Sequence, residues 1–328
     1  MTGGATAARR VLVIKLGALG DFVQALRAMA EIRRAHADAH LTLLTTPPYV
    51  DFATASGLFD AIDAGGRPSG LGETLGLVTR LRGGRYDRVY DLQTSSRSSN
   101  YFYALAPAPP QWSGVARGAS HRHSHPRRDR MQNLDRLWDQ LAEAGIVDRL
   151  PPGSAPAPDL GWAVAAALGR SPDVFARLAV PERYALLAPG ASPGRPRKRW
   201  PAQAYAILAR SLEDLGLTPV VVGGPKEVAL GEVIAAAAPS AVVAAGRTEL
   251  VEVAALGARA ALLVGNDTGP TYLAAFAGAP AVILFSSDSD PALCAPRSPR
   301  VMALQKDDLS ALAVVEVLNA SRLLLRYA

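Results

Sequence analysis

Residues 11–22 read VLVIKLGALGDF, and this stretch decides the predicted fold. An apolar run typical of a buried strand ends in a glycine-rich turn, and DFVQALRAMAEIRRAHA (21–37) then places apolar residues at helical spacing. A strand that passes through such a turn into a helix commonly binds phosphate at the helix N-terminus. Here the turn closes with Asp21, a carboxylate where an anion would sit, so the role of Asp21 is the first question.

The same strand–helix alternation continues along the chain. Strands are predicted in the first half at 11–16, 40–46, 60–64 and 86–93, and in the second half at 184–190, 218–224, 241–246, 261–264 and, last, 280–287. Helices are predicted between them, near 131–145 and at the C-terminus, whereas the basic stretch 107–130 is expected to be loop. This order predicts an α/β fold with two parallel sheets, helices on both faces, and a cleft between the two domains.

The domain boundary is expected at PPGSAPAPD (151–159), which has the composition of a linker. The predicted domains are 1–155, which would bind the acceptor, and 184–328, which would bind a nucleotide sugar, with residues 156–183 linking them. The last helix, about 309–325, is expected to pack back on the N-terminal domain.

Composition excludes several classes of protein. With 328 residues, 49% hydrophobic and 20% charged, the chain is long and apolar enough for two globular domains. A net charge of +6 suits nucleic acid, an anionic membrane or an acidic substrate, but no zinc finger or basic aromatic platform supports nucleic acid. The single cysteine, Cys294, excludes an intrachain disulfide and a cysteine-based zinc site. No signal peptide or spanning segment is recognised, so a cytoplasmic protein is expected, with transient contact to a membrane surface.

Asp21 has two interpretations. The turn is G-x-x-G, formed by Gly17 and Gly20, so it fits neither the dinucleotide-binding fingerprint nor a Walker loop. In one interpretation Asp21 caps the following helix by accepting backbone N–H bonds. In the other it is a general base that faces the ligand.

Three further turns follow predicted strands. GNDTGP (265–270) would bind a phosphate at Thr268, Gly269 and Pro270. Asp267 would cap the following helix or accept hydrogen bonds from nearby N–H groups and so hold them in position. The alternative is an ordinary capped helix start without a ligand. PGASPGRPRKRWP (189–201) contains four cations, Arg195, Arg197, Lys198 and Arg199. They suit the binding of a diphosphate, and a solvated basic loop is the alternative.

The third turn, VVVGGPKE (220–227), places Gly223 and Gly224 at a strand end, where the backbone can approach a flat or ribose-bearing ligand. Glu227 would then hold ribose hydroxyls, and an ordinary structural turn is the alternative.

The basic segment HRHSHPRRDR (121–130) has three interpretations. His121, His123 and His125 alternate along the chain and could bind zinc, or the segment could be a solvated loop. In the third interpretation its arginines pair with carboxylates or phosphates of an acidic acceptor, together with polar residues that follow strand 86–93. The predicted acceptor residues are Gln93, Ser95, Arg97, Arg122, Arg127, Arg128 and Arg130.

Taken together, VLVIKLGALGD, YDRVYDLQ, PGAS…KRWP, VVVGGPKE and GNDTGPTYLAA resemble glycosyltransferase family 9, the ADP-heptose:lipopolysaccharide heptosyltransferase family, in order and spacing from about residue 11 to 296. The resemblance implies a GT-B fold, with two Rossmann-like domains across a cleft. It also implies an inverting, metal-independent transfer from a nucleotide-diphosphate sugar, typically ADP-heptose, to a lipopolysaccharide core or related acidic glycolipid at the inner face of the inner membrane.

Carried over to this sequence, the resemblance makes Asp21 the general base and Lys198 the diphosphate-binding lysine, with donor contacts at Asp267, Thr268 and Gly269. Ser192 falls in the region of a phosphate-contacting hydroxyl, and Glu227 resembles the ribose-binding acid. Gly17 and Gly20 would let acceptor and donor sugar approach the backbone. The sequence departs from the family pattern at Gln24, where a histidine is common, and at Arg27, where a proline is common, which leaves the acceptor open.

The residues agree with this chemistry. No dense carboxylate cluster such as D-x-D is recognised near a predicted phosphate turn, so no metal and no cofactor beyond the nucleotide sugar is expected. Lysine, arginine and helix dipoles would neutralise the departing diphosphate. One carboxylate suffices for transfer, whereas a glycosidase needs two. The alternatives are a nucleotide-sugar epimerase or hydrolase of the same fold, or a non-catalytic nucleotide-sugar-binding protein; a monomer is expected.

Overall fold

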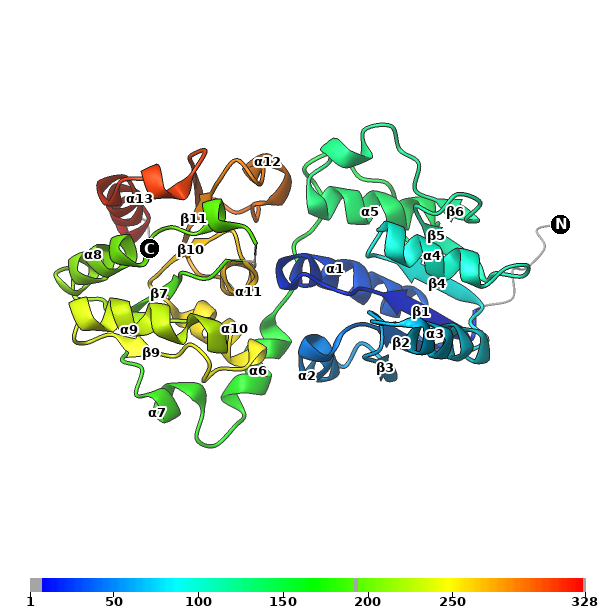
Figure 1. Ribbon diagram of the computed structural model, residues 1–328, viewed down its shortest axis with the longest axis horizontal. Helices are drawn as coiled ribbons and strands as arrows, with labels where there is room; N and C mark the ends of the chain where they lie inside the picture. Colours follow the sequence, from blue (N-terminus) through cyan, green and yellow to red (C-terminus); the bar gives the residue numbers. More distant parts are fainter. Residues whose placement is uncertain (1–7, 192–193, 327–328) are drawn as a thin grey trace. The chain divides into compact units, whose positions relative to one another are not determined.

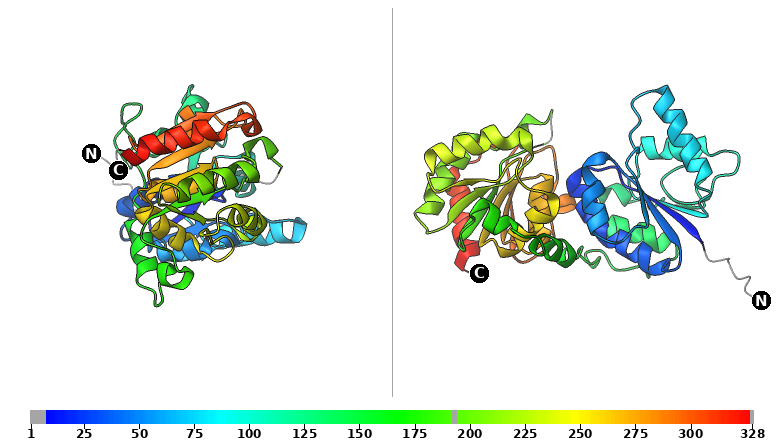
Figure 2. Two further views of the ribbon diagram at one scale, coloured as in Figure 1. Left: turned by 90° about the vertical axis from the view of Figure 1, so that its left-hand side faces the viewer. Right: turned by 90° about the horizontal axis from the view of Figure 1, so that it is seen from below.

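The computed structural model describes residues 8–191 and 194–326 and divides into two compact units, Met1–Pro158 and Asp159–Ala328 (Figure 1). Each unit contains one six-stranded parallel sheet, and helices cover both faces of each sheet (Figure 2). The prediction of an α/β fold with two parallel sheets is therefore confirmed. Among the helices of the described residues, none is both long and apolar enough to cross a membrane.

The sheet of the N-terminal unit has the strand order β3-β2-β1-β4-β5-β6. Its strands are β1 (Arg10–Ile14), β2 (His40–Leu44), β3 (Ala61–Asp63), β4 (Arg88–Asp91), β5 (Gln111–Gly114) and β6 (His121–Arg122). Its helices are α1 (Leu19–Ala35), α2 (Val50–Ala55), α3 (Leu71–Gly83), α4 (Ser96–Ala104) and α5 (Asn133–Glu143), with short 3-10 turns at Pro47–Tyr49 and Arg128–Arg130. This is the strand order of Rossmann folds, in which the direction of winding reverses between β1 and β4.

The core of this unit follows from its apolar runs. Because helices cover both faces, the strands read as nearly continuous apolar segments, and Val11, Leu12, Val13 and Ile14 of β1 are buried. In register, Val11 pairs with Leu41 of β2 and with Arg88 of β4. The α1 residues spaced for one helix face are buried as predicted: Phe22, Val23, Leu26, Met29 and Ile32.

Two strands lie where a loop was predicted. β5 and β6 fall within 107–130, and they extend the sheet beyond β4. β5 is only four residues long and is centred on Trp112, which is fully buried in the core with Leu12 and Val89. A stretch this short carries no period-2 signal, so tertiary packing creates the strand.

The sheet of the C-terminal unit has the order β12-β11-β10-β7-β8-β9, which repeats the same Rossmann arrangement with the reversal between β7 and β10. Its strands are β7 (Tyr184–Ala188), β8 (Thr218–Val221), β9 (Val242–Val243), β10 (Leu262–Asn266), β11 (Ala281–Phe285) and β12 (Val301–Gln305). Its helices are α6 (Gly161–Leu168), α7 (Val174–Leu178), α8 (Ala202–Glu213), α9 (Val228–Ala237), α10 (Leu250–Arg259), α11 (Gly269–Phe276), α12 (Pro291–Cys294) and α13 (Val314–Arg326), with 3-10 turns at Pro196–Lys198, Pro225–Glu227 and Leu309–Ala311.

Two expectations for this half are corrected, and a third is not tested. Residues 156–183, predicted as a linker, contain α6 and α7, and α6 packs against α10 within the C-terminal unit. The last strand is β12 rather than 280–287. The terminal helix α13 buries Val317 and Leu324 in the core of its own unit, against α8 and β11, and its packing on the N-terminal domain stays a prediction.

Candidate functional sites

Each unit has a polar site where its sheet reverses direction. In a doubly wound parallel sheet, the loops after the two central strands diverge to opposite faces and leave a crevice between them. In the N-terminal unit these loops follow β1 and β4, and in the C-terminal unit they follow β7 and β10. The sites that the sequence predicted at strand ends therefore fall into two separate groups, one in each unit.

The turn after β1 is held by hydrogen bonds to both neighbouring strands. Lys15 N donates to Leu44 O at 3.0 Å, and Leu16 N donates to the Gln93 side chain beyond β4 at 2.8 Å. Gly17 adopts φ +104°, and a Cβ there would lie 2.6 Å from the Tyr49 hydroxyl. Both the backbone angle and the overlying ring therefore require glycine, so Gly17 shapes the turn independently of any ligand.

Asp21 does not cap the helix. α1 begins at Leu19 after Ala18, and its first backbone bond runs from Phe22 N to Ala18 O at 2.9 Å. Asp21 is the third helical residue and Gly20 the second, and the Asp21 side chain is exposed, with no hydrogen bond or ion pair in the described part of the chain. The capping interpretation is wrong, and the carboxylate stays available to a ligand.

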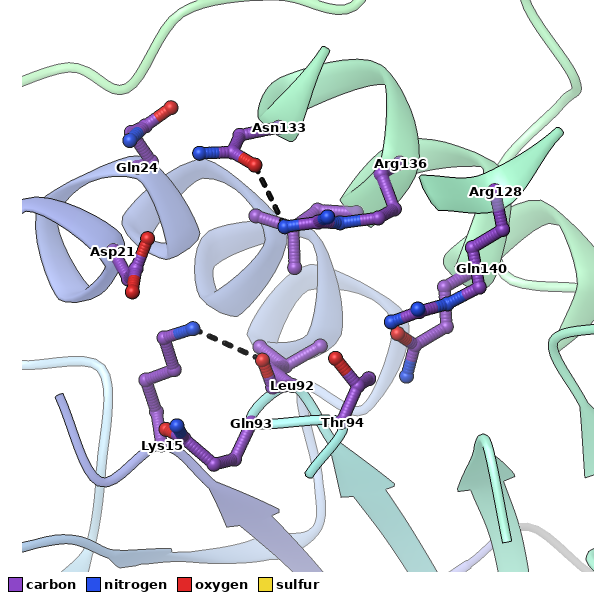
Figure 3. Close-up of a pocket in the computed structure, with 11 residues that line it drawn as sticks. Lys15, Asp21, Gln24, Leu92, Gln93, Thr94, Arg128, Asn133, Arg136 and Gln140 are labelled. Atoms are coloured by element: carbon purple, nitrogen blue, oxygen red, sulfur yellow. Dashed lines mark hydrogen bonds between the residues drawn. The ribbon is translucent and has the colours of Figure 1, made fainter. Parts of the chain in front are cut away.

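Asp21 borders a pocket of about 60 Å³ between α1, the end of β4 and α5 (Figure 3). Lys15 and Asp21 face the same open space, and Arg136 extends toward it from α5. Three cations and one carboxylate line this pocket, so its charge is positive. The lining residues are Lys15, Asp21, Gln24, Leu92, Gln93, Thr94, Arg128, Asn133, Arg136, Leu137 and Gln140.

Burial dominates the electrostatics beneath the pocket. Lys15 is 6% exposed, and its Nζ donates to Leu92 O at 3.0 Å. Burial lowers the pKa of the Lys15 ammonium; Asp21 and Asp91 oppose this shift and Arg136 adds to it. Burial also raises the pKa of Asp91 to about 6, although its Oδ1 accepts hydrogen bonds from Thr94 N and Gln93 N. The pocket floor thus holds two ionisable groups that lack full hydration.

The predicted acceptor residues separate into two groups. Gln93 and Arg128 line the pocket. Arg97 at the start of α4, Arg122 on β6 and Arg127 are exposed and lie outside the lining. Gln24 is only 2% exposed and lines the pocket, whereas Arg27 pairs with Glu31 at 2.6 Å and lies over the Trp138 ring of α5.

The three histidines do not converge. His123 is buried and contacts Asp139 at 2.9 Å, His121 contacts Arg88 at 3.0 Å, and the His125 ring accepts a bond from Arg127 N. Within residues 8–191 and 194–326, no group of three His, Cys, Asp or Glu residues is arranged to hold a metal. The zinc interpretation of this segment therefore has no geometric support. His123 is a buried residue that pairs with Asp139 inside the N-terminal unit.

In the C-terminal unit, Lys198 and Asp267 form the centre of the second site. Lys198 Nζ lies 2.5 Å from Asp267 Oδ2, and each side chain is about one-tenth exposed. Asp267 also accepts from Ser289 Oγ at 2.5 Å and from the Tyr272 hydroxyl at 2.7 Å. Asp267 was expected to cap α11 or to hold backbone N–H groups; instead it orients Lys198 at the end of β10.

Asn266 connects this site to the end of β7. Its side-chain Nδ2 donates to Pro189 O at 2.8 Å and Gly190 O at 3.1 Å. Its Oδ1 accepts from Trp200 N at 3.3 Å and from the Tyr205 hydroxyl at 3.1 Å. Because Trp200 comes two residues after Lys198, the same amide fixes the segment that carries the lysine.

The start of α11 lies beside the ion pair. Thr268 is the N-cap residue, its side chain makes no capping bond, and Gly269 and Pro270 open the helix. The first-turn N–H groups of α11, an eight-residue helix, therefore lie near Lys198, which contacts the preceding Asp267. Unpaired N–H groups beside a lysine favour the binding of an anion. Ser192, the other predicted phosphate contact, lies outside the described residues.

The glycine turn after β8 is built around Glu227. The Glu227 carboxylate accepts from Gly224 N at 2.9 Å. A Cβ at Gly223 would lie 2.7 Å from Glu227 Cβ, and one at Gly190 would lie 2.9 Å from Glu227 Cγ. Both glycines therefore make room for Glu227, which sits between the ends of β7 and β8. Its contact with ribose stays a prediction.

Sequence reasoning missed several lining residues. Lys15 carries a visible signal, because a lysine interrupts the otherwise apolar run VLVIKL. Arg136, Asn133 and Gln140 carry none: they lie on α5, and only the packing of α5 against α1 brings them to the end of β4.

Two Rossmann-like units in one chain, each with its polar site at the reversal of its sheet, define a two-domain α/β protein of the GT-B type. Solved structures agree. The glycosyltransferase family 9 protein from Veillonella parvula DSM 2008 is similar with a TM-score of 0.77 at 20% identity, covering 98% of each chain. The E. coli ADP-heptose LPS heptosyltransferase II is similar with a TM-score of 0.76 at 22% identity, covering 97% of this chain and 99% of that one.

The chain belongs to glycosyltransferase family 9 (heptosyltransferase), whose family model matches residues 74–321. Lipopolysaccharide heptosyltransferase 2 of Escherichia coli (strain K12) is 30% identical over 234 residues, which are 67% of this chain and 65% of that protein. The protein of the same name from Salmonella typhimurium (strain LT2) is 31% identical over 241 residues, with the same coverage. The match thus spans slightly less than two thirds of the length of these relatives.

Proposed function

We propose that this protein transfers heptose from ADP-heptose to a lipopolysaccharide core or a related acidic surface glycolipid, by an inverting and metal-independent mechanism. The family and the names of the similar proteins support the donor and the acceptor class. The observation that carries the proposal is the Asp21 carboxylate, which is exposed, makes no hydrogen bond or ion pair within the described residues, and borders a cationic pocket at the reversal of a Rossmann sheet.

In the proposed reaction the acceptor hydroxyl attacks the anomeric carbon of the donor while Asp21 accepts its proton. A new glycosidic C–O bond forms, the bond from the anomeric carbon to the diphosphate oxygen breaks, and ADP leaves. Proton acceptance by a positioned base contributes about 100- to 10,000-fold to such a step. Asp21 would return the proton to solvent after product release.

The C-terminal unit would stabilise the leaving group. Lys198, oriented by Asp267, and the first-turn N–H groups of α11 would receive the negative charge that develops on the diphosphate. Positive charge from these protein groups would take the place of a divalent cation. We further propose that the protein acts as a monomer at the cytoplasmic face of the inner membrane, where its glycolipid acceptor would be presented.

The base assignment is tested with Asp21→Asn, which keeps the shape of the side chain and removes its basicity. We expect kcat to fall about 100- to 10,000-fold while the Kd for ADP-heptose stays within a few-fold. Asp51→Asn is the matched control, since Asp51 is another exposed acid in the first turn of a helix of the same unit. Full transfer by the Asp21 variant would refute the base assignment.

The donor site is tested with Lys198→Met, measured by calorimetric titration with ADP-heptose. Loss of a charge-assisted contact should weaken binding by about 10- to 100-fold, whereas Arg210→Met, which removes a cation that is 60% exposed on α8, should bind as wild type. Equal affinity in the Lys198 variant would show that the diphosphate binds elsewhere. Transfer activity is also measured with EDTA, and unchanged activity is expected for a metal-independent enzyme. NMR of the anomeric configuration of the product tests whether the reaction is inverting.

A further inference from the structure

We infer that Gln93 is a positioning residue of the proposed reaction: its side-chain oxygen holds the turn that carries Asp21, so that the base is fixed from the neighbouring strand β4. The inference rests on the proposed function and deepens it, because it names what sets the position of the base. From the sequence, Gln93 was expected to contact the acceptor. The structure gives its side-chain oxygen a partner inside the protein instead.

The position of Asp21 depends on its backbone. The carboxylate is exposed and makes no hydrogen bond or ion pair with the described residues, so no side-chain contact fixes it. Asp21 lies in the first turn of α1, which begins at Leu19 directly after Gly17 and Ala18. Any shift of this turn is therefore passed on to the start of the helix and to the carboxylate.

The turn begins where the sheet opens. β1 and β4 are paired as far as Ile14 and Asp91, and beyond this pair the chain after β4 leaves the sheet. Successive backbone N–H groups of a strand point to opposite neighbours, and Lys15 N donates to β2 at 3.0 Å. The next N–H, that of Leu16, points to the β4 side, where it donates to Gln93 Oε1 at 2.8 Å. A side-chain amide thus takes the place of a strand backbone where the crevice opens.

This hydrogen bond is buried, so its loss has consequences for the turn. Leu16 is 2% exposed, and buried backbone N–H groups need a partner. A buried N–H that loses its acceptor is costly, so the chain would rearrange until Leu16 N reached water or another acceptor. Either rearrangement displaces the turn between Leu16 and α1, and Asp21 with it.

Gln93 is itself held in place. Gln93 N and Thr94 N donate to Asp91 Oδ1 at 3.1 and 2.9 Å, so a fully buried carboxylate shapes the loop that follows its own strand. From α5, Gln140 Nε2 donates to Asp91 O at 3.0 Å. In Figure 3 the Gln93 side chain extends from this loop toward Lys15, which directly follows β1. The loop is fixed from two sides, so it can hold the turn in turn.

The first test separates this role from direct contact with the acceptor. Gln93→Leu keeps the size of the side chain and removes the oxygen that Leu16 N requires. We expect kcat to fall about 10- to 100-fold, as for a small misplacement of a catalytic group. The KM for the acceptor and the Kd for ADP-heptose should stay within a few-fold. Gln111→Leu is the matched control, since it makes the same change at an exposed position of β5 in the same unit, and it should transfer as wild type.

A double-mutant cycle tests whether Gln93 acts through Asp21. Effects of residues that act as a unit do not multiply, so Gln93→Leu should lower kcat by no more than about threefold in a protein that already carries Asp21→Asn. A general loss of stability would instead lower kcat by the same factor in both backgrounds.

Amide hydrogen exchange read by NMR tests the hydrogen bond itself, without any substrate. In Gln93→Leu the Leu16 amide should exchange about 10-fold faster or more. The Lys15 amide, whose partner on β2 is unchanged, should keep its protection. Unchanged exchange in the other strands of the N-terminal unit verifies that the variant is folded.

The inference is overturned if Gln93→Leu transfers at the wild-type rate, if kcat falls equally in both backgrounds, or if exchange at Leu16 does not change. A raised KM for the acceptor with an unchanged kcat also overturns it, because Gln93 would then contact the acceptor. Failure of the proposed function would look different: the wild type would form no glycoside, or Asp21→Asn would transfer in full. The exchange experiment needs no transfer, so the two failures can be told apart.

Discussion

Replacing Asn266 by leucine removes the amide that ties the Lys198 segment to the ends of β7 and β10. The side chain is fully buried, and leucine has nearly the same volume but cannot hydrogen-bond. The substitution leaves Trp200 N and the carbonyls of Pro189 and Gly190 without their side-chain partner, whereas the Tyr205 hydroxyl retains a contact to Ala188 O at 3.4 Å.

The expected loss of stability follows from these contacts. A buried polar group that loses its partner costs about 1–3 kcal/mol. With three such groups and partial relaxation, the free energy of unfolding should fall by roughly 3–5 kcal/mol. The C-terminal unit spans 159–328, or 328 − 158 = 170 residues, and for this size each kcal/mol lowers Tm by about 2–4 °C. A decrease in Tm of about 6–12 °C corresponds to the lower bound of this loss.

Urea denaturation gives the free energy, and hydrogen exchange read by mass spectrometry locates the loss. Exchange should rise in the segments around 189–200 and 262–272 and stay unchanged in the N-terminal unit. ADP-heptose should also bind more weakly, because Lys198 loses its fixed position. Asn319→Leu makes the same chemical change at an exposed position of α13 and should alter stability by no more than about 0.5 kcal/mol. A loss below 1 kcal/mol for Asn266→Leu would refute the role given to this amide.

Two further predictions concern the N-terminal unit. Gly17→Ala should destabilise it by about 1–3 kcal/mol in urea denaturation, because φ +104° and the Tyr49 hydroxyl, 2.6 Å from the added Cβ, both oppose the substitution. Gly72→Ala is the control, since no atom lies within 4 Å of a Cβ at this position of helix α3. It should be neutral or raise the free energy of unfolding by up to ~1 kcal/mol. Burial raises the pKa of Asp91 to about 6 from 3.8, so its stabilising contribution is complete below pH 4 and is lost as the pH rises through 6. Between pH 4 and 7 the free energy of unfolding of Asp91→Asn should therefore rise by up to roughly 3 kcal/mol relative to that of the wild type, since each pKa unit is worth about 1.4 kcal/mol. If the stability of both proteins depended on pH in the same way, the burial of this charge would be contradicted.

Much of the fold was predictable because apolar strands alternate with amphipathic helices in both halves. β10 is buried throughout and β1 is buried from Val11 to Ile14, so the apolar composition of these strands alone identifies them. β5 and β6 were not predictable: QWSG and a two-residue strand owe their conformation to Trp112 and to the neighbouring strand. The helices in 156–183 were hidden by a composition that resembles a linker at its start.

The candidate sites were predictable as positions but not as contacts. Lys198 and Asp267 were both identified from turns that follow strands, yet nothing in the sequence indicates that residues 69 positions apart form an ion pair. Likewise Asp21 was placed in a ligand-facing turn, but α5 reaches that turn only through the folded packing, so Arg136 could not be found. Local signals locate strand ends, and the topology decides which strand ends share a site.

The negative charge of Asp21 at an apparent anion site is explained by comparing the two units. Both place a helix N-terminus at the reversal of a Rossmann sheet, but α11 begins with Thr268-Gly269-Pro270 beside Lys198, whereas α1 carries its own carboxylate in the first turn. The dipole of α1 therefore already has a partner, and a ligand anion in that unit must be received by other groups. Lys15 beneath the turn and Arg136 from α5 are cations that line the pocket beside it. Under the proposed function, the helix N-terminus would serve the base in one unit and the leaving group in the other, so that one fold, used twice, would supply the two opposite charges that glycosyl transfer requires.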